Sequence, residues 1–266
     1  LGVSEGENND KEIGDEGFRI KQNDKGEAVI YANTQAGLMY GTYHLKRLGD
    51  CGEISKLDKE IVEVPAFKYR VLNHWDNPNL TVERGYAGKS LWKCEELPGK
   101  IRPEYEEYAR ANASIGINGT VLNNVNADAR MLSREYLEKV KVLADIFRPY
   151  NIKVYLSLNF AAPKHLANLK TSDPLDKDVI KWWNDKVAEI YSIIPDFGGF
   201  LVKANSEGQS GPQDYGRTHA DGANMIADAV KPYGGIVMWR AFVYAPESPD
   251  RAKQAVEEFQ YLCVHL

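Results

Sequence analysis

The sequence predicts an α/β fold built on a parallel sheet and preceded by a small α+β unit. From residue 67 onward, short apolar segments alternate with longer segments of helical periodicity, which is the pattern of β/α repeats. The apolar segments are almost continuously hydrophobic, as expected for strands buried on both faces of a sheet. In front of these repeats, the first 64 residues combine two strand patterns with one helical pattern.

The N-terminal unit is predicted to cover residues 1–65. Residues 17–31 contain two strand-like segments around a turn that ends in glycine. Apolar residues spaced as on one helix face predict a helix over residues 34–48. The segment 63–66 contains a proline and marks the boundary, so we expect a second domain over residues 66–266.

Five β/α units are predicted in this second domain. We expect strands at residues 68–75, 116–125, 153–160, 197–202 and 234–244. We expect helices at residues 104–112, 133–150, 178–194, 218–231 and 248–259. A closed barrel of this type needs eight strands, so the chain contains either an open doubly wound sheet or part of a (β/α)8 TIM barrel.

Composition argues against several classes of function. The net charge is −5 and no basic tract occurs, so nucleic acid is not the expected partner. No apolar run approaches the roughly 18 residues of a membrane span, so no membrane partner is expected. The three cysteines are scattered, and neither CxxC nor HExxH occurs, so no metal site is predicted. Their odd number favours a reducing compartment, which would be the cytoplasm.

Amide, aromatic and charged residues follow the predicted strands. Because the carboxyl ends of parallel strands form the catalytic face of a β/α barrel, these residues should gather at one rim. Asn side chains can bond sugar hydroxyls, and Trp75 can stack on a sugar ring, so the pattern indicates a carbohydrate site. Alternatively, these residues cap the strands and fill the rim.

Three charged residues at this rim are candidates for chemistry. Glu207 is the candidate general acid, which requires partial burial among apolar groups to keep its carboxyl protonated near neutral pH. Lys203 and Arg240 leave neighbouring strands as two cations, which suits an anionic substrate group. The alternatives are a surface glutamate in a glycine-rich loop, and two cations that pair with Asp76, Glu83 or Asp214.

Four motifs together resemble the α-glucuronidases of glycoside hydrolase family 67. They are NHWDN, ERGYAGKSLW, LVKANSEGQSGPQDYGRTHADGANMIADA and GGIVMWRAFVY. The resemblance covers about residues 68–259, and the preceding unit resembles the end of that family's N-terminal domain. It implies a partial TIM barrel of five β/α units and a hydrolase of xylan degradation. It implies no metal or organic cofactor.

The resemblance also implies roles for individual residues. The family removes glucuronic acid, or its 4-O-methyl form, from xylose in glucuronoxylan-derived oligosaccharides, with inversion at an α-1,2 link. Glu207 matches the general acid, and Lys203 and Arg240 match residues that bind the uronate carboxylate. Trp75 and Val125 match residues that line the sugar and its methyl group.

The chain is expected to lack other parts of such an enzyme. The carboxylates that activate water in the family lie on later strands, and its homodimer forms through a C-terminal helical domain. We therefore expect the 266 residues alone to be inactive. Two alternatives remain, a class I aldolase-like lyase with Lys203 as Schiff-base nucleophile, and a non-catalytic uronate-binding module.

Overall fold

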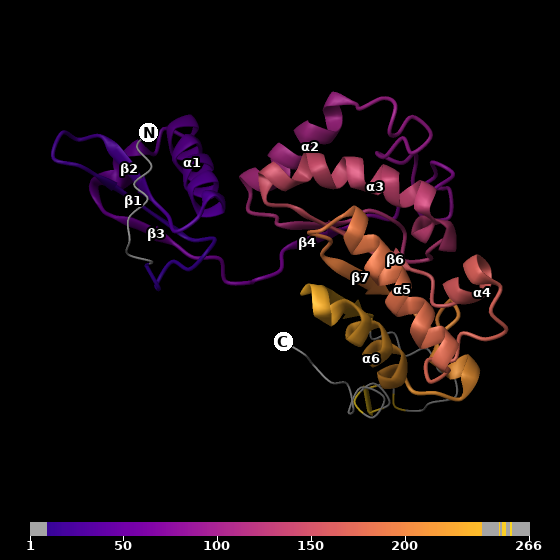
Figure 1. Cartoon of the computed structure of the whole chain (residues 1–266). Helices are drawn as coiled ribbons and strands as arrows, with labels where there is room; N and C mark the ends of the chain where they lie inside the picture. The colour runs from indigo at the N-terminus through magenta and orange to yellow at the C-terminus, as the bar shows by residue number, and fades with distance from the viewer. Residues whose placement is uncertain (1–9, 241–249, 251, 254–255, 257–266) are drawn as a thin grey trace. The chain divides into compact units, whose positions relative to one another are not determined.

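The computed structural model describes residues 10–240, 250, 252–253 and 256. The chain divides into two compact units, of which the first comprises residues 1–71, 102–119 and 146–152, and the second comprises residues 72–101, 120–145 and 153–266. The predicted fold class is confirmed, since a small antiparallel sheet near the N-terminus precedes a curled parallel sheet of five strands with helices (Figure 1). The domain boundary at residue 65 stays a prediction.

The first unit contains a three-stranded sheet in the order β2-β1-β3. Its strands are β1 Phe18–Gln22, β2 Ala28–Tyr31 and β3 Ile61–Glu63. Ile20 lies opposite Ile30 on one neighbour and Ile61 on the other. The buried core that results also includes side chains of helix α1 and of the 3₁₀ turn η1, which span Gln35–Asp50 and Ile54–Asp58. Helix α2 Pro103–Ser114 and the turn η3 Arg148–Tyr150 belong to the same unit.

The parallel sheet has the order β4-β5-β6-β7-β8, which is also the order along the chain. Its strands are β4 Val71–Asn73, β5 Gly119–Val121, β6 Lys153–Leu158, β7 Gly199–Val202 and β8 Ile236–Trp239. A glycine is required where β7 approaches β8: Gly199 has φ +126°, and a Cβ there would lie 1.9 Å from the carbonyl oxygen of Ile236. Because the strand order follows the chain, successive loops leave the sheet side by side at one edge.

Among the described residues, four helices lie between the strands from β5 to β8. They are α3 Arg134–Phe147, α4 Ala162–Ala167, α5 Lys177–Ile193 and α6 His219–Val230, with the 3₁₀ turns η2 Ala129–Leu132, η4 Pro212–Tyr215 and η5 Lys231–Tyr233. Figure 1 shows α5 and α6 side by side. The first turn of α6 is fixed by a capping box, in which Thr218 Oγ1 accepts from Asp221 N and Asp221 Oδ2 accepts from Thr218 N.

The structure differs from the predicted elements mainly at their ends. The strand predicted over 116–125 ends at Val121, although backbone bonds continue beyond it, from Leu122 N to the Tyr155 carbonyl and from Asn124 N to the Asp76 carbonyl. Strand β3 and helix α4 were not predicted, since both are too short to show periodicity. Most of the helix predicted over 248–259 lies outside the described residues.

Candidate active site at the carboxyl ends of the strands

The two predicted cations leave neighbouring strands at the same level. Val202 and Trp239 are partners in the β7–β8 ladder, and Lys203 and Arg240 follow them directly. The Arg240 backbone N–H continues this pairing by donating to the Val202 carbonyl at 2.9 Å. Lys203 and Arg240 therefore begin from adjacent points of the rim, as the sequence predicted.

Lys203 is a buried cation whose nearest charge is Glu207. Its side chain is only 2% exposed, and its ammonium group forms an ion pair with Glu207 Oε2. The same Nζ donates to Asn126 Oδ1 at 2.7 Å. The sequence had left Asp76, Glu83 or Asp214 open as partners of the cations, but the partner of Lys203 is the candidate acid itself.

Glu207 lies half exposed on a tight turn of the loop between β7 and η4. Its side chain is 47% exposed, and Arg84 Nη2 lies 3.3 Å from its Oε1. The hydrogen bond and charge of Lys203, followed by the charge of Arg84, lower the pKa of Glu207 below its ordinary value. The prediction that apolar burial raises this pKa is therefore wrong, because two cations contact the carboxylate and lower its pKa.

The loop that carries Glu207 is fixed by its own side chains. Glu207 and Asn205 both have φ of +49°, so the backbone turns sharply at each. Asn205 donates to Asp214 Oδ1 at 2.9 Å and accepts from the backbone of Gln213 at 3.0 Å. Asp214 also accepts from Gly211 N at 3.2 Å. Asp214 thus stabilises the loop.

A second loop, residues 77–90 after β4, supplies two residues that the sequence did not assign to the site. Two amides fix its tip, since Asn77 and Asn124 donate to the Glu83 carbonyl at 2.8 and 3.1 Å. Glu83 has φ of +56°, and its Oε2 is buried without a hydrogen-bond partner among the described residues. The next residue is Arg84, which contacts Glu207. The glycines near this loop tip are the sequence feature that could have indicated a sharp turn there, since glycine permits such turns.

An open cavity of about 420 Å³ lies between this loop and the segment that follows β5. Its lining is mostly polar and is formed by Asn77, Pro78, Asn79, Thr81, Glu83, Arg84, Gly85, Asn124, Asn126, Asp128 and Arg130. Two of these residues connect it to the charged pair, because Asn126 accepts from Lys203 and Arg84 contacts Glu207. Amides, a hydroxyl and an unpartnered carboxylate oxygen are groups that bind sugar hydroxyls.

Arg240 and Trp75 form a second contact at the rim. The guanidinium carbon of Arg240 lies 5.9 Å from the centroid of the Trp75 ring, within the range of a cation–π interaction. Val125 is fully buried. The structure therefore brings Lys203 with Glu207, and Arg240 with Trp75, while Val125 lies beneath the surface.

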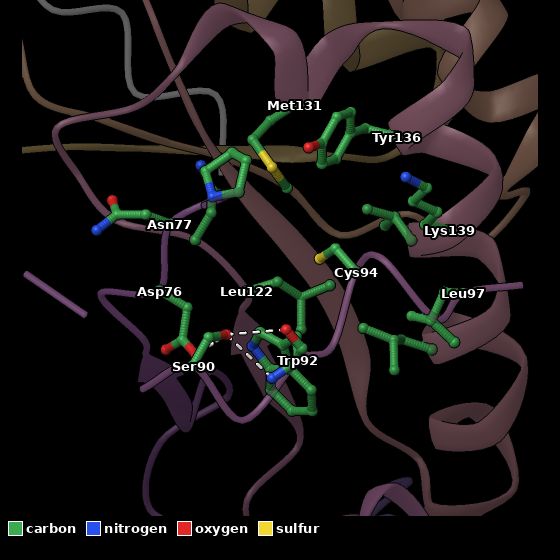
Figure 2. A pocket seen from close by; sticks show the side chains of 14 residues that line it. Asp76, Asn77, Ser90, Trp92, Cys94, Leu97, Leu122, Met131, Tyr136 and Lys139 are labelled. Atoms are coloured by element: carbon green, nitrogen blue, oxygen red, sulfur yellow. Dashed lines mark hydrogen bonds between the residues drawn. The ribbon is translucent and has the colours of Figure 1, made fainter. Parts of the chain in front are cut away.

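Asp76 is part of the scaffold. Its Oδ1 accepts from Ser90 Oγ at 2.5 Å and from Leu91 N at 2.9 Å, and His74 Nδ1 lies 3.5 Å from its Oδ2. Burial opposes the charge, but the hydrogen bonds from His74 and Ser90 outweigh it and lower the pKa of Asp76. Figure 2 shows Asp76, Ser90 and Trp92 beside a separate cavity of about 20 Å³, which has room for one water molecule.

Among the residues that the structure describes, no group of three or more His, Cys, Asp or Glu side chains could hold a metal ion. None of the helices in that part of the chain is long and apolar enough to cross a membrane.

Family models match almost the whole chain. The model of the glycosyl hydrolase family 67 middle domain matches residues 52–265, and that of the family 67 N-terminus matches residues 3–45. The chain is 45% identical over 249 residues to an α-glucuronidase of Hypocrea jecorina, covering 89% of this chain and 29% of the relative. It is 45% identical over 251 residues to α-glucuronidase A of Emericella nidulans, covering 88% and 29%. The chain thus spans about 30% of the length of the curated relatives it matches.

Solved structures share the fold at low sequence identity. An enzyme of glycoside hydrolase family 138 that targets pectin rhamnogalacturonan II has a TM-score of 0.55 and 14% identity, over 96% of this chain and 32% of that one. A chitobiase of Flavobacterium johnsoniae has a TM-score of 0.52 and 12% identity, over 93% and 45%. These likenesses support the β/α architecture alone.

Proposed function

Because the chain belongs to glycosyl hydrolase family 67, we propose that it forms part of an α-glucuronidase, a glycoside hydrolase that releases glucuronic acid. The relatives from Hypocrea jecorina and Emericella nidulans that carry this name support the activity. The observation that carries the proposal is the pair of Lys203 and Glu207 at the strand ends. It provides a buried cation for a uronate and a carboxyl group for acid catalysis.

The proposed substrate is a xylo-oligosaccharide from glucuronoxylan that carries glucuronic acid, or its 4-O-methyl form, on an α-1,2 link. Lys203 and Arg240 bind the uronate carboxylate, which their adjacent places directly after β7 and β8 support. Trp75 packs against the sugar, and Val125, which is fully buried, lies beneath the surface that borders the methyl group. The polar side chains that line the neighbouring cavity bind sugar hydroxyls.

In this proposal, Glu207 protonates the glycosidic oxygen as the bond to xylose breaks. Its half-exposed position at the rim supports this role, since the leaving oligosaccharide must extend toward solvent. Inversion requires a base about 6.5–9.5 Å from the acid, on the opposite face of the sugar. Asp76 and Asp214 are not assigned to this base, because both are bonded into loops.

The alternative of an aldolase-like lyase is not favoured. A Schiff-base nucleophile needs the free lone pair of a neutral amine. Nζ of Lys203 instead donates to Asn126 and is ion-paired with Glu207. A uronate-binding module without catalysis would use the same cations, so only turnover distinguishes it from the enzyme.

The test uses a chimera in which this chain replaces the matching segment of the Hypocrea jecorina relative, because the match spans 29% of that protein. We expect the chimera to release glucuronic acid from xylose-linked α-glucuronides, and to cleave the matched α-glucosides far more slowly. Binding of glucuronic acid without turnover would instead indicate the binding module. A borohydride-trapped adduct on Lys203 would indicate the lyase.

A further inference from the structure

We propose that the carboxylate of the substrate takes Lys203 from Glu207, so that the uronide itself causes the general acid to become protonated. This inference rests on the proposed function and adds a second role for Lys203. In that role, Lys203 determines specificity in the chemical step as well as in binding.

The geometry places one buried ammonium group between two carboxylates that both require it. Lys203 has three N–H donors, of which one bonds Asn126 Oδ1 at 2.7 Å and another serves Glu207 Oε2. The side chain is 2% exposed, so little of its ammonium group faces solvent, and a uronate that bonds this nitrogen comes close to Glu207 whichever donor it uses. A substrate carboxylate bound there comes into contact with the charge of Glu207.

Two carboxylates that contact one ammonium group repel each other, so keeping both ionised costs free energy. The repulsion strongly raises one of the two pKa values. The carboxylate of glucuronic acid is more acidic than a glutamate side chain, by comparison with other carboxyls next to electron-withdrawing groups. Glu207 is therefore the group that takes up the proton.

Glu207 also has a place to move to. Arg84 contacts its other oxygen, Oε1, at 3.3 Å, and Arg84 is 60% exposed, so this contact lies on the solvent side. Within the described part of the chain, the charged groups that contact Glu207 are Lys203 and Arg84, and Glu83 Oε1 lies 3.6 Å from Nε of Arg84. Loss of Lys203 as partner and arrival of a second anion both raise the pKa of Glu207, while Arg84 continues to lower it.

Binding of the uronide is accompanied by the uptake of one proton from water. Before the substrate binds, Lys203 is a cation and Glu207 is an anion. In the occupied site, Lys203 pairs with the uronate, and one oxygen of Glu207 carries the proton that it later donates to the glycosidic oxygen. A neutral hexose leaves the Lys203–Glu207 pair intact, so its site lacks the proton needed for bond cleavage.

The experiment measures proton uptake when the chimera binds glucuronic acid. Calorimetric titrations in buffers of different ionisation enthalpy, between pH 5 and pH 7, count protons directly. We expect uptake of up to one proton, and an affinity that rises by up to about tenfold for each unit that the pH falls. Glucose serves as the neutral ligand and should cause no uptake.

The matched control is Glu207→Gln, which keeps the shape of the side chain and removes its titration. This variant should still bind glucuronic acid, but without the proton uptake and with a flat pH dependence. Glucuronic acid that binds the parent chimera with the same uptake and pH dependence as the control would overturn the inference while leaving the proposed function intact. Failure of the parent to prefer glucuronic acid over glucose would overturn both.

Discussion

Replacing Lys203 by methionine should abolish the preference of the enzyme for uronides. Methionine has a similar shape and no charge, so the buried site stays filled. The side chain of Lys203 is 2% exposed, so its charge is almost fully removed from water. Truncating one partner of a buried, hydrogen-bonded charge pair costs about 2–5 kcal/mol. At 1.36 kcal/mol for each factor of ten, kcat/KM for the glucuronide should fall about 30- to 5,000-fold.

The assay compares kcat/KM of the chimera and its Lys203→Met variant on a xylose-linked glucuronide and on the matched glucoside. The glucoside should be affected far less, because it has no carboxylate to lose its partner. Lys181→Met is the control, since that lysine is 73% exposed and an exposed ion pair contributes little. Equal losses on both substrates, or an unchanged preference for the glucuronide, would refute the assignment of Lys203 as the carboxylate clamp.

Three further predictions concern other residues of the rim and its scaffold. Glu207→Ala should reduce activity on xylose-linked glucuronides about 10²- to 10⁴-fold and reduce it much less on aryl glucuronides, whose leaving groups need little protonation; equal losses would remove Glu207 from the acid role. Arg240→Ala should weaken transition-state binding of the uronide by about 2–5 kcal/mol, and a retained preference over the glucoside would show that Arg240 does not bind the carboxylate. Because the pKa of Asp76 is lowered by folding, its contribution to stability is present above the unfolded pKa of about 3.9 and is lost as the pH falls through the lowered value. In urea titrations at different pH values, Asp76→Asn should therefore reduce the loss of unfolding free energy that occurs at acid pH. The same loss in the variant and the parent would contradict this.

The sequence predicted the order of the elements and the rim position of the charged residues. Continuous apolar segments such as the one before Lys203 have few alternatives to a buried strand, and the chain order of parallel strands then fixes which loops are neighbours. For this reason, the sequence alone predicted that Lys203 and Arg240 are neighbours at the rim.

The partners of these residues could not be predicted from local pattern. The turn at Glu207 depends on a left-handed backbone and on Asn205, which bonds residues eight and nine positions further along. The contact of Arg84 with Glu207 joins loops more than a hundred residues apart. No periodicity encodes such contacts, so the electrostatic environment of Glu207, and the direction of its pKa, followed only from the structure.

The most direct test of the central claim is a crystal structure of the chimera with glucuronic acid. We expect the sugar carboxylate to lie within about 3 Å of Lys203 Nζ and in hydrogen-bond contact with the guanidinium of Arg240. We also expect Glu207 to be displaced from the ammonium group. A sugar bound with its carboxylate away from both cations, while Lys203 remains paired with Glu207, would contradict it.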